Sequence, residues 1–244
     1  MTQTMTATVP AAGSKSLAAR ILGVLFAPRA TYADVAASPR WLGVFLTVFL
    51  VMSAAATAFV ATEVGRTAVV DQQIAQSEAY GRTVSQVQVD ALERMSANYV
   101  YFAPVFQFFG QTIAMLIVAG LAFAVFTALL GGDATFKQVF AIVAHSGVVL
   151  AALSLFTTPL AYARESVSGA TNLAVFLPFL DERSFAARML GAIDLIYIWW
   201  MISLAIGLGV LYRKRTAPIA TSLLAIYAAI GLIIAVIKTV MSGV

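Results

Sequence analysis

The stretch "LLGGDATFKQVFAIVAHS", residues 129–146, separates two long uncharged runs and decides how the chain is divided. A glycine pair after an apolar run is typical of a helix C-terminus, because glycine readily adopts the left-handed conformation that ends a helix. Thr135 is followed three residues later by Gln138, which is the spacing of a capping box at a helix start. A phosphate-binding loop is the alternative, but no Gly-Lys-Ser/Thr follows these glycines. We therefore predict a tight turn between two membrane-buried helices.

Long uncharged runs extend on both sides of this turn. They cover positions 41–62, 95–132, 138–163 and 216–237. A helix needs about 20 apolar residues to cross a bilayer core of ~30 Å, and each run is long enough. Barrel strands would instead be alternating segments of about 10 residues. With 61% hydrophobic and only 11% charged residues, the sequence predicts an all-α polytopic membrane protein.

The order of these segments predicts five spans, preceded by a disordered cytoplasmic tail over residues 1–16 and interfacial amphipathic helices over 17–40. A membrane domain over residues 41–240 then includes an outer helical loop at 63–103. The expected spans cover about 41–62, 106–130, 139–159, 192–212 and 217–237. The amino-terminal stretch does not have the pattern of a cleavable signal peptide.

Two details are expected in the interfacial segment. Apolar residues at helical spacing leave Lys15 and Arg20 facing lipid headgroups. Thr31 and Asp34 have capping-box spacing, which would start a second short helix.

Lysine and arginine are distributed unevenly between the two sides of this arrangement. With the N-terminus inside, the inner segments carry a net charge of +6 and the outer segments −1. Basic residues favour the cytoplasmic side, so we predict a multi-pass protein of the inner (plasma) membrane, with its N-terminus in the cytoplasm and its C-terminus outside. The inner cations also form candidate sites for a partner or for lipid. They are Arg29, Arg40, Lys137, Arg213, Lys214 and Arg215.

Four polar residues within the expected spans are candidates for an intramembrane role: Gln107, Gln111, His145 and Asp194. His145 would relay protons or bind a metal, or would simply be a neutral imidazole bonded to a neighbouring helix. Asp194 lies near the outer end of its span, where it would reach headgroups or Arg188. The glutamines would line a solute path or hold helices together.

Pairs of small residues four positions apart also recur along the expected spans. They are Gly110/Ala114, Gly120/Ala124, Ser203/Gly207 and Ala205/Gly209. They predict close helix packing within the chain or between copies in a homo-oligomer.

Catalytic machinery is not evident in the sequence. There is no Gly-x-Ser-x-Gly, no His-Glu-x-x-His and no cysteine, so we expect no enzyme activity, no catalytic residues, no metal and no cofactor. The basic pI of about 9.5 reflects mainly the inner face, so nucleic acid is not an expected partner.

Three stretches together resemble the Yip family of membrane proteins, which are named for interaction with Ypt/Rab GTPases. They are "RILGVLFAPRATYADVAASPR", "GGDATFKQVFAIVAHS" and "DLIYIWWMISLAIGLGVLYRKRTAPIA", and the resemblance spans most of residues 18–235. In style the chain resembles the bacterial branch, and the resemblance implies a multispanning scaffold with a cytosolic N-terminus. The segment before the first expected span, positions 1–40, is shorter than in eukaryotic members, and GTPase binding is not transferred.

Two functional classes remain. In the first, the protein is a non-catalytic scaffold or adaptor that organises membrane lipids or partner proteins through its basic cytoplasmic face, although these cations would also serve simply to set topology. In the second, it is a small-solute transporter or channel subunit. The shortage of buried charge favours the scaffold.

Overall fold

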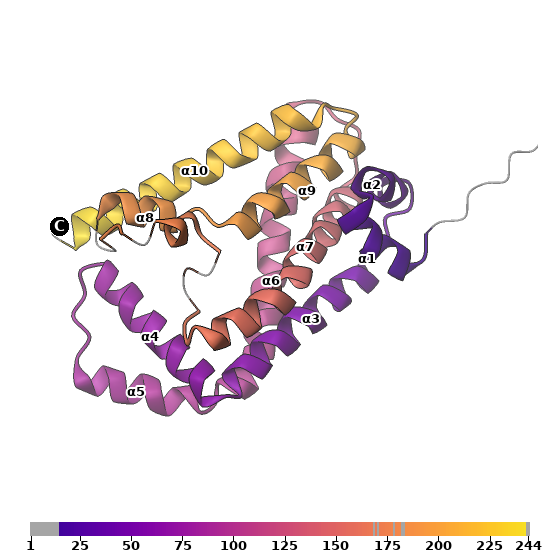
Figure 1. The fold of residues 1–244 in the computed structure, drawn as a ribbon. Coiled ribbons are helices and arrows are strands. Elements are labelled where there is room, and N and C mark those ends of the chain that lie inside the picture. Colours follow the sequence, from indigo (N-terminus) through magenta and orange to yellow (C-terminus); the bar gives the residue numbers. More distant parts are fainter. Residues whose placement is uncertain (1–14, 168, 170, 178, 182–183, 243–244) are drawn as a thin grey trace, which may run out of the picture.

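The computed structural model describes residues 15–242 except 168, 170, 178 and 182–183. The regular secondary structure of this part is helical apart from one isolated bridge between Asn172 and Asp194. The expected disordered tail therefore lies almost entirely outside the described residues. The elements, in order, are α1 (Leu17–Phe26), α2 (Pro28–Ala37), α3 (Leu42–Val60), α4 (Glu63–Ala79), α5 (Gln86–Ser96), α6 (Tyr99–Phe123), the π-helical η1 (Ala124–Leu129), α7 (Phe136–Ala163), the 3₁₀ turn η2 (Leu173–Phe176), α8 (Phe185–Gly191), α9 (Leu195–Leu211) and α10 (Thr216–Met241) (Figure 1).

Four of these helical segments are long and apolar enough to cross a membrane: α3, α6 with η1, α7 and α10. The fold is therefore that of an all-α polytopic membrane protein, as predicted. The remaining expected span corresponds to α9, which is apolar but has only 17 residues. At about 1.5 Å per residue it is at the short end of what crosses a bilayer. The fifth crossing and the five-span layout remain predictions.

The turn before α7 has the local structure that its sequence predicts. Gly131 has a φ of +68°, a conformation that costs glycine little. Thr135 is the N-cap of α7 and forms a complete capping box with Gln138. A helix end and a helix start therefore meet within a few residues.

The first two helices form a hairpin, but not by the expected cap. Pro28 is the first residue of α2, where its missing N–H costs nothing. Thr31 and Asp34 lie inside α2, and so the predicted capping box is wrong. Both side chains are instead used in contacts with the segment before and within α1.

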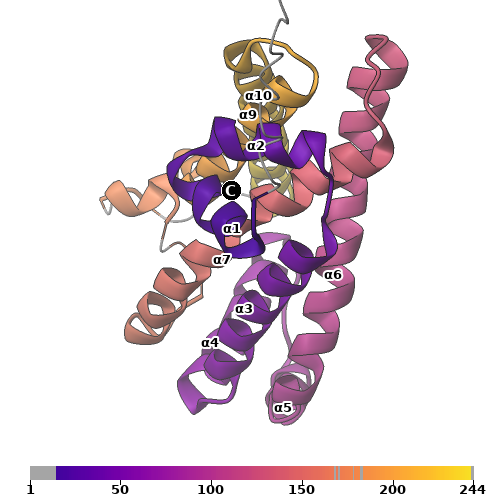
Figure 2. The same ribbon diagram turned by 90° about the vertical axis from the view of Figure 1, so that its right-hand side faces the viewer.

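The core is built around the first half of α7. All residues from Val139 to Val149 are buried, and α7 contacts α1, α2, α3, α6 and α9. By contrast, α6 packs mainly on α3 and α7 and leaves most of its surface exposed (Figure 2). In a bilayer that surface would face lipid.

The connecting elements gather at the two ends of the bundle. The α1–α2 hairpin, the turn between η1 and α7 and the turn between α9 and α10 lie at one end, while α4, α5 and α8 lie toward the other (Figure 1). This arrangement brings together residues that are far apart in the sequence.

Candidate functional site

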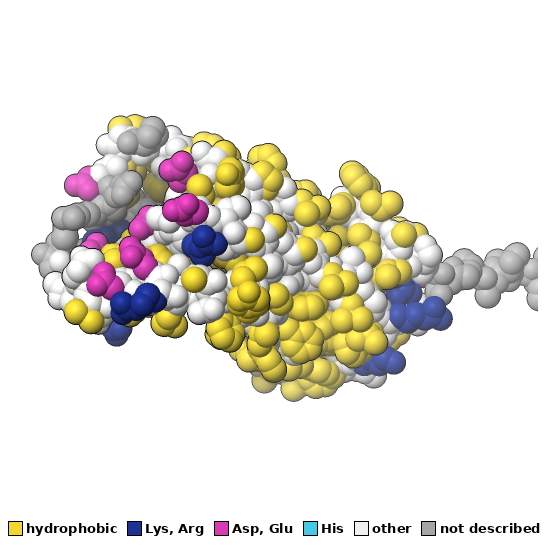
Figure 3. All heavy atoms as spheres, turned by 90° about the horizontal axis from the view of Figure 1, so that it is seen from below, with side chains coloured by type: hydrophobic (Ala, Val, Ile, Leu, Met, Phe, Trp, Pro, Cys, Tyr) yellow, Lys and Arg dark blue, Asp and Glu magenta, His cyan; other side chains and the backbone are white. Residues whose placement is uncertain are grey.

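The six predicted binding cations are all exposed, and they come from the segments at the hairpin end. Arg29 is in α2, Arg40 follows it, Lys137 opens α7, and the other three occupy the turn between α9 and α10. No ion pair between described residues involves any of them. In the view of Figure 3 the acidic side chains gather at the opposite end, and a wide hydrophobic band separates the two.

Two turns at this end enclose a hollow of about 390 Å³. One wall is the turn that contains Gly131, Gly132 and Asp133, and the other contains Arg213 and Lys214. Two of the six exposed cations therefore line a concave surface, where an anionic group would meet them together.

Aromatic packing holds the two turns against each other. The ring of Tyr212 stacks on Phe126 with centroids 5.0 Å apart, and its hydroxyl lies 2.9 Å from Thr127 Oγ1. A Cβ on Gly132 would lie 2.7 Å from both the Phe126 carbonyl oxygen and the Tyr212 ring. Only glycine therefore allows this approach.

The backbone of Arg213 has the conformation usually reserved for glycine at a helix end. Its φ is +53°, and the Lys214 N–H donates to the Gly209 carbonyl at 2.9 Å. A left-handed residue other than glycine costs roughly 1–2 kcal/mol. This cost falls at a charged position on the rim of the hollow.

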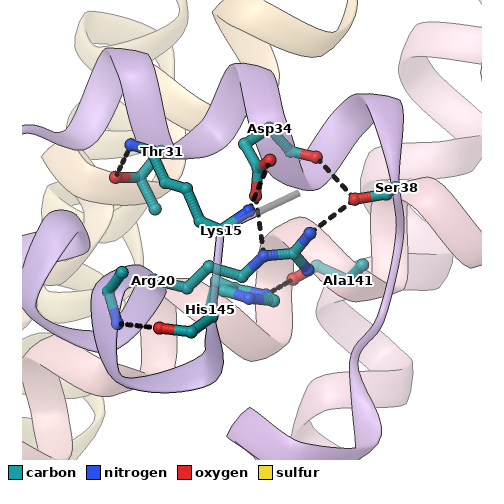
Figure 4. Close-up of polar contacts among 9 residues, drawn as sticks. Lys15, Arg20, Thr31, Asp34, Ser38, Ala141 and His145 are labelled. Carbon is teal, nitrogen blue, oxygen red and sulfur yellow. Dashed lines mark hydrogen bonds and ion pairs between the residues drawn. The ribbon is translucent and has the colours of Figure 1, made fainter. Parts of the chain in front are cut away.

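Arg20 does not face lipid headgroups, because its side chain is buried within the protein, which corrects the sequence prediction. It is only 2% exposed, and its Nε lies 2.7 Å from Asp34 Oδ2. A second guanidinium nitrogen donates to Ser38 Oγ, while Lys15 donates to Thr31 and to Asp34 (Figure 4). The cluster locks α1 to α2.

His145 lies beneath this cluster and is fully buried. Its Nδ1 is 2.7 Å from the Ala141 carbonyl oxygen of its own helix, so the expected bond to a neighbouring helix is wrong. Its Nε2 has no hydrogen-bond partner among the described groups. In Figure 4 the imidazole lies beside the Arg20 guanidinium. A proton-relay or metal-binding role for His145 stays an untested alternative.

The glutamine pair faces the bundle from α6. Gln107 Nε2 donates to Gln111 Oε1 at 3.4 Å, and Gln111 is buried with its own Nε2 unpartnered among the described groups. This bond lies within α6 and does not link two helices.

Asp194 is a helix cap rather than a charge within a span. Its carboxylate accepts from the Ile196 N–H at 2.8 Å and from the Thr171 hydroxyl at 2.7 Å. The expected contact with Arg188 is wrong, because Arg188 donates to Thr239 and Ser242. The structure therefore does not bring the four intramembrane polar candidates together.

The described residues show no metal centre. They contain no group of three or more histidines, cysteines or acids placed to hold a metal ion. The hollow between the turns could not be predicted from the sequence, because its two walls come from distant parts of the chain. The buried Arg20–Asp34 pair was also not predicted, since its only signal was an acid near several bases.

The comparisons with known proteins agree with the architecture. The chain matches the model of the Yip1 domain over residues 22–237, which includes most of the hairpin, nearly all of the long helices and both turns of the hollow. No curated protein and no solved structure gives a significant match. The chain belongs to the Yip1 domain family.

Proposed function

We propose that this multi-pass membrane protein is a non-catalytic scaffold or adaptor that uses its basic hairpin end to hold anionic lipid or an acidic partner protein. The observation that carries the proposal is the arrangement of Arg213 and Lys214 on the rim of a hollow, together with four more exposed cations at the same end. Each cation near an anionic leaflet contributes about 1 kcal/mol. In this proposal the hairpin end faces the cytoplasm of a cell whose inner membrane holds the chain.

The placement of the polar residues supports the scaffold over the transporter. A solute path needs polar side chains on a continuous cavity, whereas His145 is fully enclosed and Asp194 caps α9. A hollow of about 1000 Å³ opens at the other end of α10, and its lining contains none of the four polar candidates. The transporter is therefore the weaker proposal.

The test compares the wild-type protein with an Arg213→Ala/Lys214→Ala/Arg215→Ala variant. Both proteins are cross-linked in native membranes, purified and assayed for a stoichiometric partner. Both are also reconstituted and tested for binding to vesicles that contain phosphatidylserine, with vesicles of phosphatidylcholine alone as the comparison. The matched control is Arg66→Ala/Arg94→Ala/Arg164→Ala, which removes three cations from other parts of the molecule. Because the chain contains no cysteine, single introduced cysteines can confirm that topology is unchanged.

The proposal expects a partner or vesicle binding that is lost in the first variant and kept in the control. Equal behaviour of all three proteins would overturn it. Flux of small solutes through reconstituted liposomes that is abolished by His145→Ala and Gln111→Ala would instead establish the transporter.

A further inference from the structure

The end of the molecule opposite the hairpin contains a separate hollow of about 1000 Å³. Its walls come from the last turn of α4, the loop at residues 81–84, α8 and the final turns of α10 (Figure 1). This volume is at the upper end of the range for small-molecule sites. None of the six cations of the proposed adaptor face lines it.

One wall of the hollow is a single face of α10. Tyr227, Ile230, Ile234 and Lys238 line it at steps of three or four residues, which places them in a row along the helix. From Ile230 to Lys238 this row extends about 12 Å along the axis. It passes from two isoleucines to an ammonium group at the end of the helix, so it is apolar at one end and cationic at the other.

Three cations converge on the charged end of this hollow. Arg82 enters from the loop after α4, Arg188 from α8 and Lys238 from α10, and they face one lining acid, Glu78. The outer segments as a whole have a net negative charge. The local excess of positive charge is therefore a property of this hollow and not of the surface around it.

Arg188 and Lys238 are held in place by neutral groups. Arg188 donates to the hydroxyls of Ser242 (2.7 Å) and Thr239 (3.4 Å), and Lys238 Nζ lies 5.4 Å from the centre of the Tyr80 ring. The side chain of Arg82 is exposed. None of the three forms an ion pair with an acid of the described chain, so their charge remains available to a ligand.

The loop after α4 packs against the end of α10 through a backbone contact that requires glycine. Gly81 has a φ of +71°, and a Cβ there would overlap the Met241 carbonyl oxygen. The loop therefore touches the last turn of α10 directly, and Arg82 and Lys238 line the same hollow.

We infer that this hollow binds one anionic phospholipid, with the phosphate among Arg82, Arg188 and Lys238 and the upper acyl chain along Ile230 and Ile234. Guanidinium groups match the geometry of a phosphate oxyanion. The apolar row lies on α10, which is long enough to span the bilayer. A lipid can therefore enter the site from within the membrane. This site is separate from the proposed adaptor face.

The test measures bound lipid on the full-length protein in detergent by native mass spectrometry. Phosphatidylglycerol is titrated against phosphatidylcholine as the zwitterionic comparison. Arg82→Gln/Arg188→Gln/Lys238→Gln removes the cations of the hollow, and Arg66→Gln/Arg94→Gln/Arg164→Gln removes three that do not line it. Because Arg188 also bonds α10, Arg82→Gln alone serves as a variant that removes no side-chain hydrogen bond found in the structure.

Wild type and the control triple are expected to bind phosphatidylglycerol at least fivefold more tightly than phosphatidylcholine. The triple variant that removes the cations of the hollow should lose this preference, and Arg82→Gln alone should weaken phosphatidylglycerol binding about threefold. Equal binding by wild type and both hollow variants would overturn the inference, as would an equal loss in the control.

Two further experiments distinguish a bound lipid from a bound free anion. Ile234→Trp fills the apolar part, and it should weaken phosphatidylglycerol binding at least fivefold. Glycerol 3-phosphate carries the same phosphate without acyl chains, and it should not displace the lipid at millimolar concentration. Efficient displacement by glycerol 3-phosphate together with no effect of Ile234→Trp would show a free-anion site and refute the lipid assignment.

Discussion

Arg20 Nε lies 2.7 Å from Asp34 Oδ2, and the two side chains are 3% and 17% exposed. They are on consecutive helices, so the ion pair links α1 to α2. A buried pair contributes little by itself, but removing one partner leaves the other charge buried and uncompensated.

Replacing Asp34 with Ala is therefore expected to destabilise the hairpin strongly. The expected cost is about 3–5 kcal/mol, read as a lower melting temperature of the purified protein and faster protease cleavage around residue 27. Asp133→Ala, which removes an exposed acid at the same end, is the control and should melt like the wild type. An Asp34→Ala protein as stable as this control would show that the pair does not hold the hairpin.

Two glycines predicted to mediate helix packing should respond in opposite ways to alanine. A Cβ on Gly207 would lie 2.5 Å from Ile142 Cγ2 and 3.1 Å from the Tyr32 ring, whereas nothing lies within 4 Å of a Cβ on Gly110. Gly207→Ala is expected to cost about 1–3 kcal/mol through overpacking. Gly110→Ala should be neutral or stabilise by about 0.5–1 kcal/mol. Thermal melts of the two variants test this difference, and equal shifts in melting temperature would contradict the packing of α9 on α7.

The hydroxyl of Tyr32 should make stability sensitive to alkaline pH. Burial raises the pKa of Tyr32, and this outweighs the lowering effect of its 2.7 Å hydrogen bond with Ser203. A pKa raised in the folded state means that the stabilisation is complete below the unfolded value of about 10 and is lost above it. Melting temperatures of wild type should therefore fall steeply above pH ~10, and those of Tyr32→Phe should fall less.

At neutral pH, Tyr32→Phe should cost about 1 kcal/mol for the lost hydrogen bond. Tyr101→Phe, at a position 74% exposed, is the matched control and should follow the wild-type profile. Parallel alkaline profiles for wild type and Tyr32→Phe would refute the assignment.

The crossing of the bilayer by α9 can be tested by labelling. Arg164 follows α7 and Lys214 follows α9, and both are exposed. A cysteine at one of these positions should react with a membrane-impermeant maleimide only from outside the cell, and a cysteine at the other only from inside. Asp133→Cys, before α7, should behave like Lys214→Cys. Reaction of the Arg164 and Lys214 positions from the same side would show that α9 does not cross.

Local signals in the sequence were sufficient for much of the fold. The glycines at 131 and 132 and the Thr135–Gln138 pair are close in the chain, so a turn and a cap followed from short-range geometry. The length of uncharged runs predicted the long helices in the same way. These features depend only on residues that are neighbours in the sequence.

The sequence did not reveal features that depend on distant partners. Arg20 and Val24 share a buried face of α1, but a basic residue beside an apolar stripe also fits a headgroup, and only Asp34 on the next helix decides between the two. Both hollows likewise need turns or helices that are far apart in the chain. The candidate cations were predicted, but the surface they line was not.

The position of α9 has a consequence for biogenesis. Trp200 Nε1 donates to Ser146 on α7, and Ser203 forms a hydrogen bond with Tyr32 in the hairpin. Two earlier segments therefore have hydrogen-bond partners that are synthesised later. Chains are synthesised from the N-terminus, and until α9 arrives these polar groups of the hairpin and α7 have no partner from that helix. The hairpin end therefore completes its contacts only late in translation, and a chain that stops before residue 195 lacks both of these hydrogen-bond partners.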